Sequence, residues 1–166
     1  PTFFPVAALE IPEGVTATTL VEAYDPNGDV LTYSLGTAPL SATINANTSR
    51  FAWPTNEEIG FGVYTATVEA SDGLFTASQV LTITVNEVNA PPLLGPNADQ
   101  SVVLGNPITF TAIATDTDIP TQTLTFSLID APTGATIGPD SGQFNWLTDV
   151  SGVFTPVVAV SDGELT

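Results

Sequence analysis

Two stretches of the sequence decide the fold: APLSATINANTSRFAW at Ala38–Trp53 and APTGATIGPDSGQFNW at Ala131–Trp146. They share the order of small residues, turn residues and a final F-x-W, and they lie 93 residues apart. A long stretch that recurs at a fixed distance indicates two copies of one structural unit. We therefore read the 166-residue chain as a tandem repeat.

The match continues on both sides of these stretches. AYDPNGDVLTYSL at Ala23–Leu35 corresponds to ATDTDIPTQTLTFSL at Ala114–Leu128, and SDGLFT at Ser71–Thr76 corresponds to SDGELT at Ser161–Thr166. The offset changes from 91 to 93 and then to 90 residues, and the changes fall where loops are expected. The sequence predicts one repeat at residues 1–91 and a second at 92–166, with the boundary between two adjacent prolines.

Within each repeat the hydrophobic pattern has a period of two. In residues 64–70 and 81–85, Tyr, Ala, Val, Leu and Ile alternate with Thr and Glu, which is typical of half-buried strands. Turn signals such as Asn27-Gly28 and Asp72-Gly73 separate the strands, and no stretch has a helical period. About seven short strands in roughly 90 residues predict an all-β antiparallel sandwich for each repeat.

The charge balance limits the possible partners. The chain has 18 acidic residues and one basic residue, Arg50, which gives a net charge of −17. Such a chain repels the phosphates of nucleic acids and anionic lipids, and divalent cations are its natural partners. No apolar run approaches the roughly 18 residues of a membrane-spanning helix, so we expect no membrane insertion.

The longest distinctive stretch is ATIGPDSGQFNWLTDVSGVFTPVVAVSDG at Ala135–Gly163, and the first repeat carries the same elements. A turn of small residues, F-x-W and a strand that ends in SDG together resemble bacterial immunoglobulin-like and cadherin-like repeats of the dystroglycan type. The resemblance implies two tandem Greek-key sandwiches. It also implies an extracellular location, in a secreted or cell-surface bacterial protein in which other repeats are the nearest partners.

The similarity to cadherins implies a calcium site at the junction between repeats. Its expected ligands are Glu13, Glu57 or Glu58, Glu87, Asn89, Asp116, Asp118 and Asp162. Calcium takes six to eight oxygen ligands from loops and tolerates irregular geometry, which suits these residue types. The sequence departs from the pattern at Ala90, where related linkers usually continue with an Asp.

An equivalent half-site is expected at the start of the first repeat. Its ligands would be Asp25, Asn27, Asp29 and Asp72. The alternative is that residues 27–29 only form a turn and that the acidic surface serves solubility.

The two tryptophans allow two interpretations. Exposed indoles stack on sugar rings, but Trp53 lies two residues after Phe51, and Trp146 two after Phe144, so each pair points to one face of its strand. This spacing favours the core over a sugar-binding site.

No catalytic constellation is recognisable, because the chain has no His, Cys or Lys to pair with a nucleophile. We therefore expect a non-catalytic, calcium-binding structural or adhesion module that contacts a cell-surface protein or polysaccharide. The alternatives are a carbohydrate-binding accessory module of a polysaccharide-degrading enzyme and a subunit of an extracellular filament.

The repeats differ after the SDG turn. The first continues with ASQVLTITVNEVNA at Ala77–Ala90, whereas the second ends with SDGELT at Thr166. We expect the second sandwich to lack its last strand and to expose an apolar groove beside an unpaired strand edge. Such an edge permits self-association through strand pairing.

Overall fold

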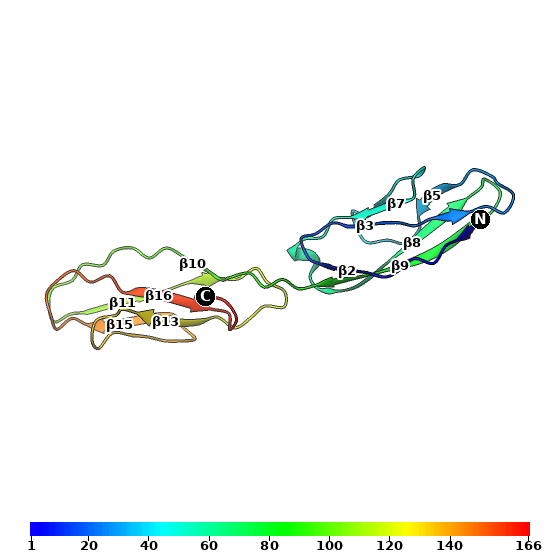
Figure 1. Cartoon of the computed structure of the whole chain (residues 1–166). Helices are drawn as coiled ribbons and strands as arrows, with labels where there is room; N and C mark the ends of the chain where they lie inside the picture. The colour runs from blue at the N-terminus through cyan, green and yellow to red at the C-terminus, as the bar shows by residue number, and fades with distance from the viewer. The chain divides into compact units, whose positions relative to one another are not determined.

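A computed structural model describes residues 1–166 and divides them into unit 1, Pro1–Val88, and unit 2, Asn89–Thr166 (Figure 1). Both units are built from β-strands, and the prediction of two β-sandwich repeats is confirmed. The single helical element is the 3₁₀ turn η1 at Glu57–Ile59, and no helix is long and apolar enough to span a membrane.

Unit 1 has two main sheets. The strand order is β2-β9-β8-β5 in one and β3-β7-β6 in the other, and β1 pairs with β4. The strands are β1 Thr2–Phe3, β2 Leu9–Pro12, β3 Ala17–Leu20, β4 Ala23–Tyr24, β5 Thr32–Leu35, β6 Thr43–Ile44, β7 Arg50–Trp53, β8 Gly62–Ser71 and β9 Thr76–Asn86. All pairs are antiparallel except β2 with β9, so β9 is held by a parallel neighbour on one edge and an antiparallel neighbour on the other.

Unit 2 repeats most of this plan. Its strands are β10 Leu93–Leu94, β11 Pro107–Thr111, β12 Ala114–Thr115, β13 Thr125–Ile129, β14 Thr136–Ile137, β15 Gln143–Leu147 and β16 Val157–Ser161. The orders β11-β15-β14, β13-β16 and β10-β12 correspond to β3-β7-β6, β5-β8 and β1-β4. The register is kept as well, because Ala17 lies opposite Trp53 and Ile108 opposite Trp146. No strand of unit 2 corresponds to β2 or β9.

The two units differ in how well their cores are closed. The buried cluster of unit 1 contains Ala17, Val21, Phe51, Trp53, Ala66, Val68, Leu81, Ile83 and Val85, whereas that of unit 2 contains Ala112, Phe126 and Val160. Three of the nine residues in unit 1 come from β9, so this strand accounts for part of the difference.

Both tryptophans belong to the interior. Trp53 is 1% exposed and Trp146 is 5% exposed, and their indole N–H groups donate to the carbonyls of Leu40 and Thr133. The expectation that they are core residues is confirmed, and neither offers a flat exposed face on which a sugar ring stacks.

Candidate metal centres

Each unit brings three carboxylates together. The Glu cluster of unit 1 consists of Glu13, Glu57 and Glu87, and the Asp cluster of unit 2 consists of Asp116, Asp118 and Asp162. Within each cluster, one oxygen from every member lies within 4.8 Å of the others. The residues predicted as one set of calcium ligands are thus found in two groups, each formed within its own unit.

The Glu cluster is built on β2, β9 and η1. Glu13 directly follows β2, where its backbone N–H donates to Asn86 O at 2.9 Å and its Oε1 accepts the Val88 N–H at 3.1 Å. Its side chain is 7% exposed, and Oε2 is buried without a hydrogen-bond partner. Glu87 comes directly after β9, so the parallel pairing of β2 with β9 sets these two glutamates side by side.

The short helix η1 carries the two other predicted calcium ligands of unit 1, Glu57 and Glu58, and brings only one of them into the cluster. Asn56 caps the helix by accepting the Ile59 N–H through Oδ1 at 3.2 Å. Glu57 is half-buried and joins the cluster, whereas Glu58 is exposed and lies outside it.

The Asp cluster begins directly after β12. The Asp118 N–H donates to Asp116 Oδ1 at 3.1 Å, which folds the D-x-D stretch into a tight turn. Asp118 is only 1% exposed, and its two carboxylate oxygens accept the Ala90 N–H at 3.2 and 2.9 Å. Asp116 Oδ2 is buried and has no hydrogen-bond partner.

Asp162 completes the cluster from the turn after β16. Its Oδ1 accepts the backbone N–H groups of Leu165 at 2.6 Å and Glu164 at 2.7 Å, and its Oδ2 accepts from Asn89 Nδ2 at 3.0 Å. These bonds, that from Leu165 above all, lower the pKa of Asp162 below its ordinary value of 3.8, although desolvation acts in the opposite direction. The carboxylate therefore carries its charge at neutral pH.

Asn89 and Gln122 extend the Asp cluster with amide groups. Gln122 Nε2 donates to Asn89 Oδ1, and Gln122 Oε1 is buried without a hydrogen-bond partner. Gln122 was not among the predicted ligands. A signal was present, because the offset between the repeats grows from 91 residues at Asp116 to 93 at Leu128, which marks an insertion around this residue.

The residues predicted for the half-site at the start of unit 1 come together only in part. Asp25 Oδ2 lies 3.1 Å from the Pro1 amino nitrogen, and Asp72 Oδ2 lies 4.0 Å from it. The turns match those of unit 2, since the Asn27 N–H donates to Asp25 Oδ1 at 2.8 Å. The side chains of Asn27 and Asp29 are exposed. A metal site here remains a prediction.

The chemistry of both clusters suits a hard divalent cation. The chain offers one basic side chain to balance 18 acidic residues, and Arg50 is exposed on β7. Buried carboxylates are expected to be paired or to coordinate a metal. Buried oxygens without a hydrogen-bond donor, such as Glu13 Oε2, Asp116 Oδ2 and Gln122 Oε1, fit a cation better than they fit an apolar interior.

The fold is similar to that of cadherin ectodomains. The repeats EC1-2 of human protocadherin-24 match with 16% identity and a TM-score of 0.57, over 97% of this chain and 93% of that one. The repeats EC1-4 of Drosophila N-cadherin match with 19% identity and a TM-score of 0.61, over 96% of this chain and 47% of that one. No curated protein matches the sequence.

A family match covers nearly the whole chain. The family described as Putative Ig domain matches residues 5–86 and again residues 91–166, one match in each unit. The two matches follow the repeat found in the sequence and the two sandwiches of the structure. The chain therefore belongs to the Putative Ig domain family, of which it contains two tandem copies.

Proposed function

We propose that the chain is a non-catalytic, extracellular structural or adhesion segment that binds calcium at the Glu cluster and at the Asp cluster. The observation that carries the proposal is the convergence, in each unit, of three carboxylates with buried oxygens, in a protein with one basic side chain. The tandem arrangement suits a spacer in which neighbouring repeats are the first partners.

The residues present supply the donors that calcium needs. In unit 2 the carboxylates of Asp116, Asp118 and Asp162 would hold the ion, with Gln122 Oε1 as an amide ligand. In unit 1 the three glutamates of the Glu cluster would do so. Bound calcium supplies positive charge that offsets the mutual repulsion of the carboxylates.

The calcium affinity expected for such sites fits an extracellular location. Calcium sites in extracellular modules have dissociation constants of roughly 0.1 to 1 mM, so a calcium-rich medium is needed to fill them.

The two clusters are hydrogen-bonded to the same short stretch of chain. Glu13 accepts the N–H of Val88, and Asp118 accepts the N–H of Ala90, two residues later. We expect an ion bound in either cluster to restrict the motion of the carboxylate, Glu13 or Asp118, that accepts a hydrogen bond from this stretch. Calcium would thus order the linker and stiffen the segment, which is the mechanical role that we propose.

Thermal unfolding in calcium tests the proposal. The chain is melted in excess calcium, in excess magnesium and in chelator at constant ionic strength. Ligand at a hundred times its dissociation constant contributes about 2.7 kcal/mol, which corresponds to a Tm increase on the order of 10 °C for domains of this size. Magnesium should raise the Tm less than calcium does, because Mg²⁺ requires near-ideal octahedral coordination with shorter metal–oxygen distances.

Variants locate the effect. Asp116→Asn with Asp118→Asn should remove most of the calcium stabilisation of unit 2 and leave that of unit 1, and Glu13→Gln should do the reverse. The matched control is Asp140→Asn with Asp149→Asn, which removes the same charge from exposed positions of unit 2. If the melting curves in calcium and in chelator superimpose, calcium binding is refuted. If the control variant loses as much calcium stabilisation as Asp116→Asn with Asp118→Asn, the effect is general screening of negative charge and not binding at the Asp cluster.

A further inference from the structure

Unit 1 carries two adjoining hollows beside η1. The first has a volume of about 370 Å³ and the second about 350 Å³, and Leu40 and Ile59 line both of them. Glu13, Glu57 and Glu87 line neither, so the hollows are separate from the Glu cluster. We call the two hollows together the η1 groove.

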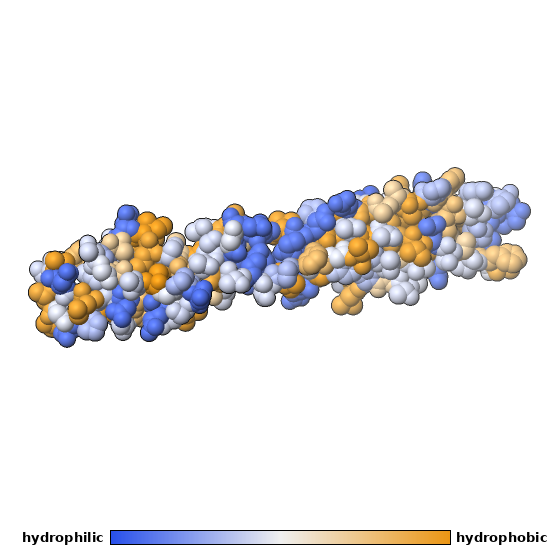
Figure 2. Space-filling view, turned by 90° about the horizontal axis from the view of Figure 1, so that it is seen from below, coloured by the Kyte–Doolittle hydropathy of each residue, from blue (hydrophilic) through white to orange (hydrophobic).

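The two hollows differ in chemistry. The first is lined mainly by apolar and aromatic side chains, those of Ala38, Pro39, Leu40, Trp53, Ile59 and Tyr64. The second adds the polar side chains of Ser41, Thr55, Asn56 and Glu58. Leu40, at their shared rim, is 93% exposed, and apolar residues reach the surface of unit 1 in the space-filling view (Figure 2). The η1 groove thus places an apolar hollow beside one that carries the negative charge of Glu58.

Hydrogen bonds from the aromatic floor hold the two walls of the apolar hollow. The Trp53 indole N–H donates to the Leu40 carbonyl at 3.1 Å. The Tyr64 hydroxyl donates to the carbonyl of Ile59 and, at 3.3 Å, to that of Gly60. The two rings contact each other, with centroids 4.9 Å apart. The hollow is therefore formed before a ligand binds, which lowers the entropic cost of binding.

Unit 2 shows which of these features the fold itself requires. The Trp146 indole N–H donates to the Thr133 carbonyl at 3.2 Å, so the bond from the tryptophan is common to both repeats. The side chains around it differ, because Thr133 takes the place of Leu40 and Phe154, which has no hydroxyl, takes the place of Tyr64. The apolar rim and the tyrosine hydroxyl are therefore specific to unit 1.

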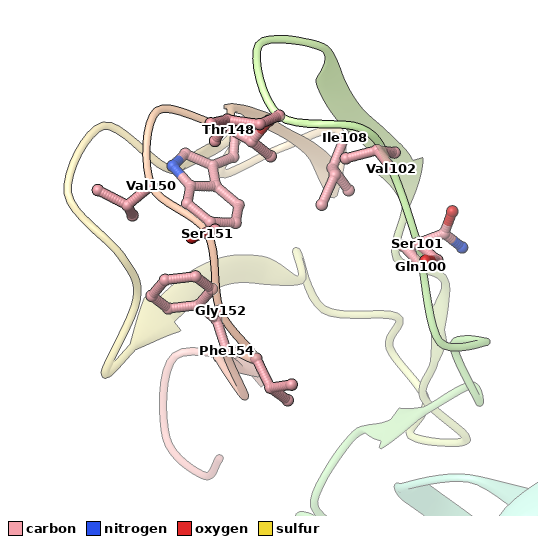
Figure 3. Close-up of a pocket in the computed structure, with 12 residues that line it drawn as sticks. Gln100, Ser101, Val102, Ile108, Thr148, Val150, Ser151, Gly152 and Phe154 are labelled. Carbon is pink, nitrogen blue, oxygen red and sulfur yellow. The ribbon is translucent and has the colours of Figure 1, made fainter.

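The helical turn beside the groove is also specific to unit 1. The offset between the repeats falls from 93 residues at Trp53 to 90 at Gly62, so the segment that contains η1 is 93 − 90 = 3 residues shorter in unit 2. Figure 3 shows the shorter segment, which carries Val150 and Ser151, as an irregular loop. The residues that build the η1 groove are thus additions to the common fold.

We propose that the η1 groove binds an extended peptide that carries an aromatic side chain and, two positions away, an arginine. In an extended chain, residues two apart point to the same side and lie roughly 7 Å from each other, which suits two adjoining hollows. The aromatic side chain fills the apolar hollow, and the arginine pairs with Glu58. Charge complementarity favours this partner, because a chain with a net charge of −17 attracts basic peptides and repels acidic ones.

A peptide suits the η1 groove better than a sugar does. Trp53 is 1% exposed, so its ring offers no face for a sugar to stack on. The indole N–H and the Tyr64 hydroxyl donate their hydrogens to backbone carbonyls of unit 1. A sugar in the apolar hollow would lose hydrogen bonds with water that these groups do not replace.

Peptide titration into the complete chain tests the proposal. The probe is the capped pentapeptide Ser-Phe-Ser-Arg-Ser, added to isotope-labelled protein while NMR follows the backbone amides and the two indole N–H groups. We expect saturable shifts at Leu40, in η1 and at Trp53, and none at Trp146. A short peptide loses conformational freedom on binding, so the expected dissociation constant is on the order of 1 mM.

Two control peptides separate the two contacts. Replacement of the Phe by Ser keeps the positive charge and should weaken binding about tenfold, because the buried aromatic contact is lost. Replacement of the Arg by Glu should weaken binding about fivefold, since an exposed ion pair contributes little. If the peptide without the Phe binds as well as the probe, the attraction is general electrostatics and the proposal is overturned.

Variants of the chain locate the peptide. Leu40→Thr introduces the residue that unit 2 carries at this place and should weaken binding about fivefold, because part of the apolar wall is lost. Glu58→Gln should weaken it about threefold and bring the affinities of the Arg and Glu peptides closer together. The matched control, Glu22→Gln, removes one charge from an exposed position of unit 1 and should leave the affinity unchanged.

Three further outcomes would overturn the proposal. The probe causes no saturable shift in the η1 groove, or its shifts appear equally in unit 2, or Glu22→Gln weakens binding as much as Glu58→Gln does. A neutral disaccharide, maltose, is titrated in parallel. If maltose shifts the groove residues and the peptide does not, the ligand of the groove is a sugar and the peptide proposal is wrong.

Discussion

At the scale of single residues, the turn after β8 makes one carboxylate sensitive to acid. Asp72 Oδ1 accepts the N–H groups of Phe75 at 2.7 Å and Leu74 at 2.8 Å, and these bonds lower the pKa of Asp72 below 3.8, with a smaller effect from the Pro1 amino group. The stabilisation is complete above the pKa of the unfolded chain and is lost as the pH falls through the lower, folded value. Asp72→Asn should therefore weaken the fall in the free energy of unfolding below about pH 4.

Urea unfolding at several pH values, followed at the Trp53 indole, measures this effect in unit 1. Asp29→Asn is the matched control, because it removes the same charge from an exposed position. The control variant should show the same pH dependence of the free energy of unfolding as the parent protein. An unchanged profile in Asp72→Asn as well would mean that the turn contributes nothing to the acid response.

At the scale of elements, β8 and β16 are equivalent strands in different surroundings. β8 pairs on both edges, and Val68 is fully buried, whereas β16 pairs on one edge and Val158 is half-buried. Val68→Ala should cost about 2 kcal/mol, because two methyl groups leave a closed core. Val158→Ala should cost less than half as much. Chemical unfolding, with each unit followed at its own tryptophan, compares the two costs, and equal values would contradict the open core of unit 2.

At the scale of the whole molecule, the two units should differ in stability. Ten hydrophobic residues are buried in unit 1 and five in unit 2, and buried apolar area is the main source of stability. On heating in chelator, the NMR signal of the Trp146 indole should disappear before that of Trp53. Chelator keeps calcium out of the comparison. Simultaneous loss of both signals, or earlier loss of Trp53, would show that the smaller number of buried hydrophobic residues does not make unit 2 the less stable unit.

The sequence alone determined the repeat, the strands and the position of the tryptophans. These features depend on short-range patterns: alternation with a period of two places Phe51 and Trp53 on one face, and the SDG turn ends β8 and β16 alike. The resemblance to cadherin-like repeats also selected six residues that the structure gathers into clusters, among them Glu13 and Asp118.

Only the tertiary structure decided how the carboxylates are grouped. The Glu cluster joins residues 13, 57 and 87 from three segments, and sequence spacing does not report which side chains of separate loops converge. Glu57 and Glu58 are adjacent in the chain, yet η1 leaves Glu57 half-buried in the Glu cluster and Glu58 exposed outside it. Gln122 donates a hydrogen bond to Asn89, which lies 33 residues earlier in the chain. The period of two determines on which face of a strand a side chain lies, but which loops come together is determined by how the strands pack in three dimensions.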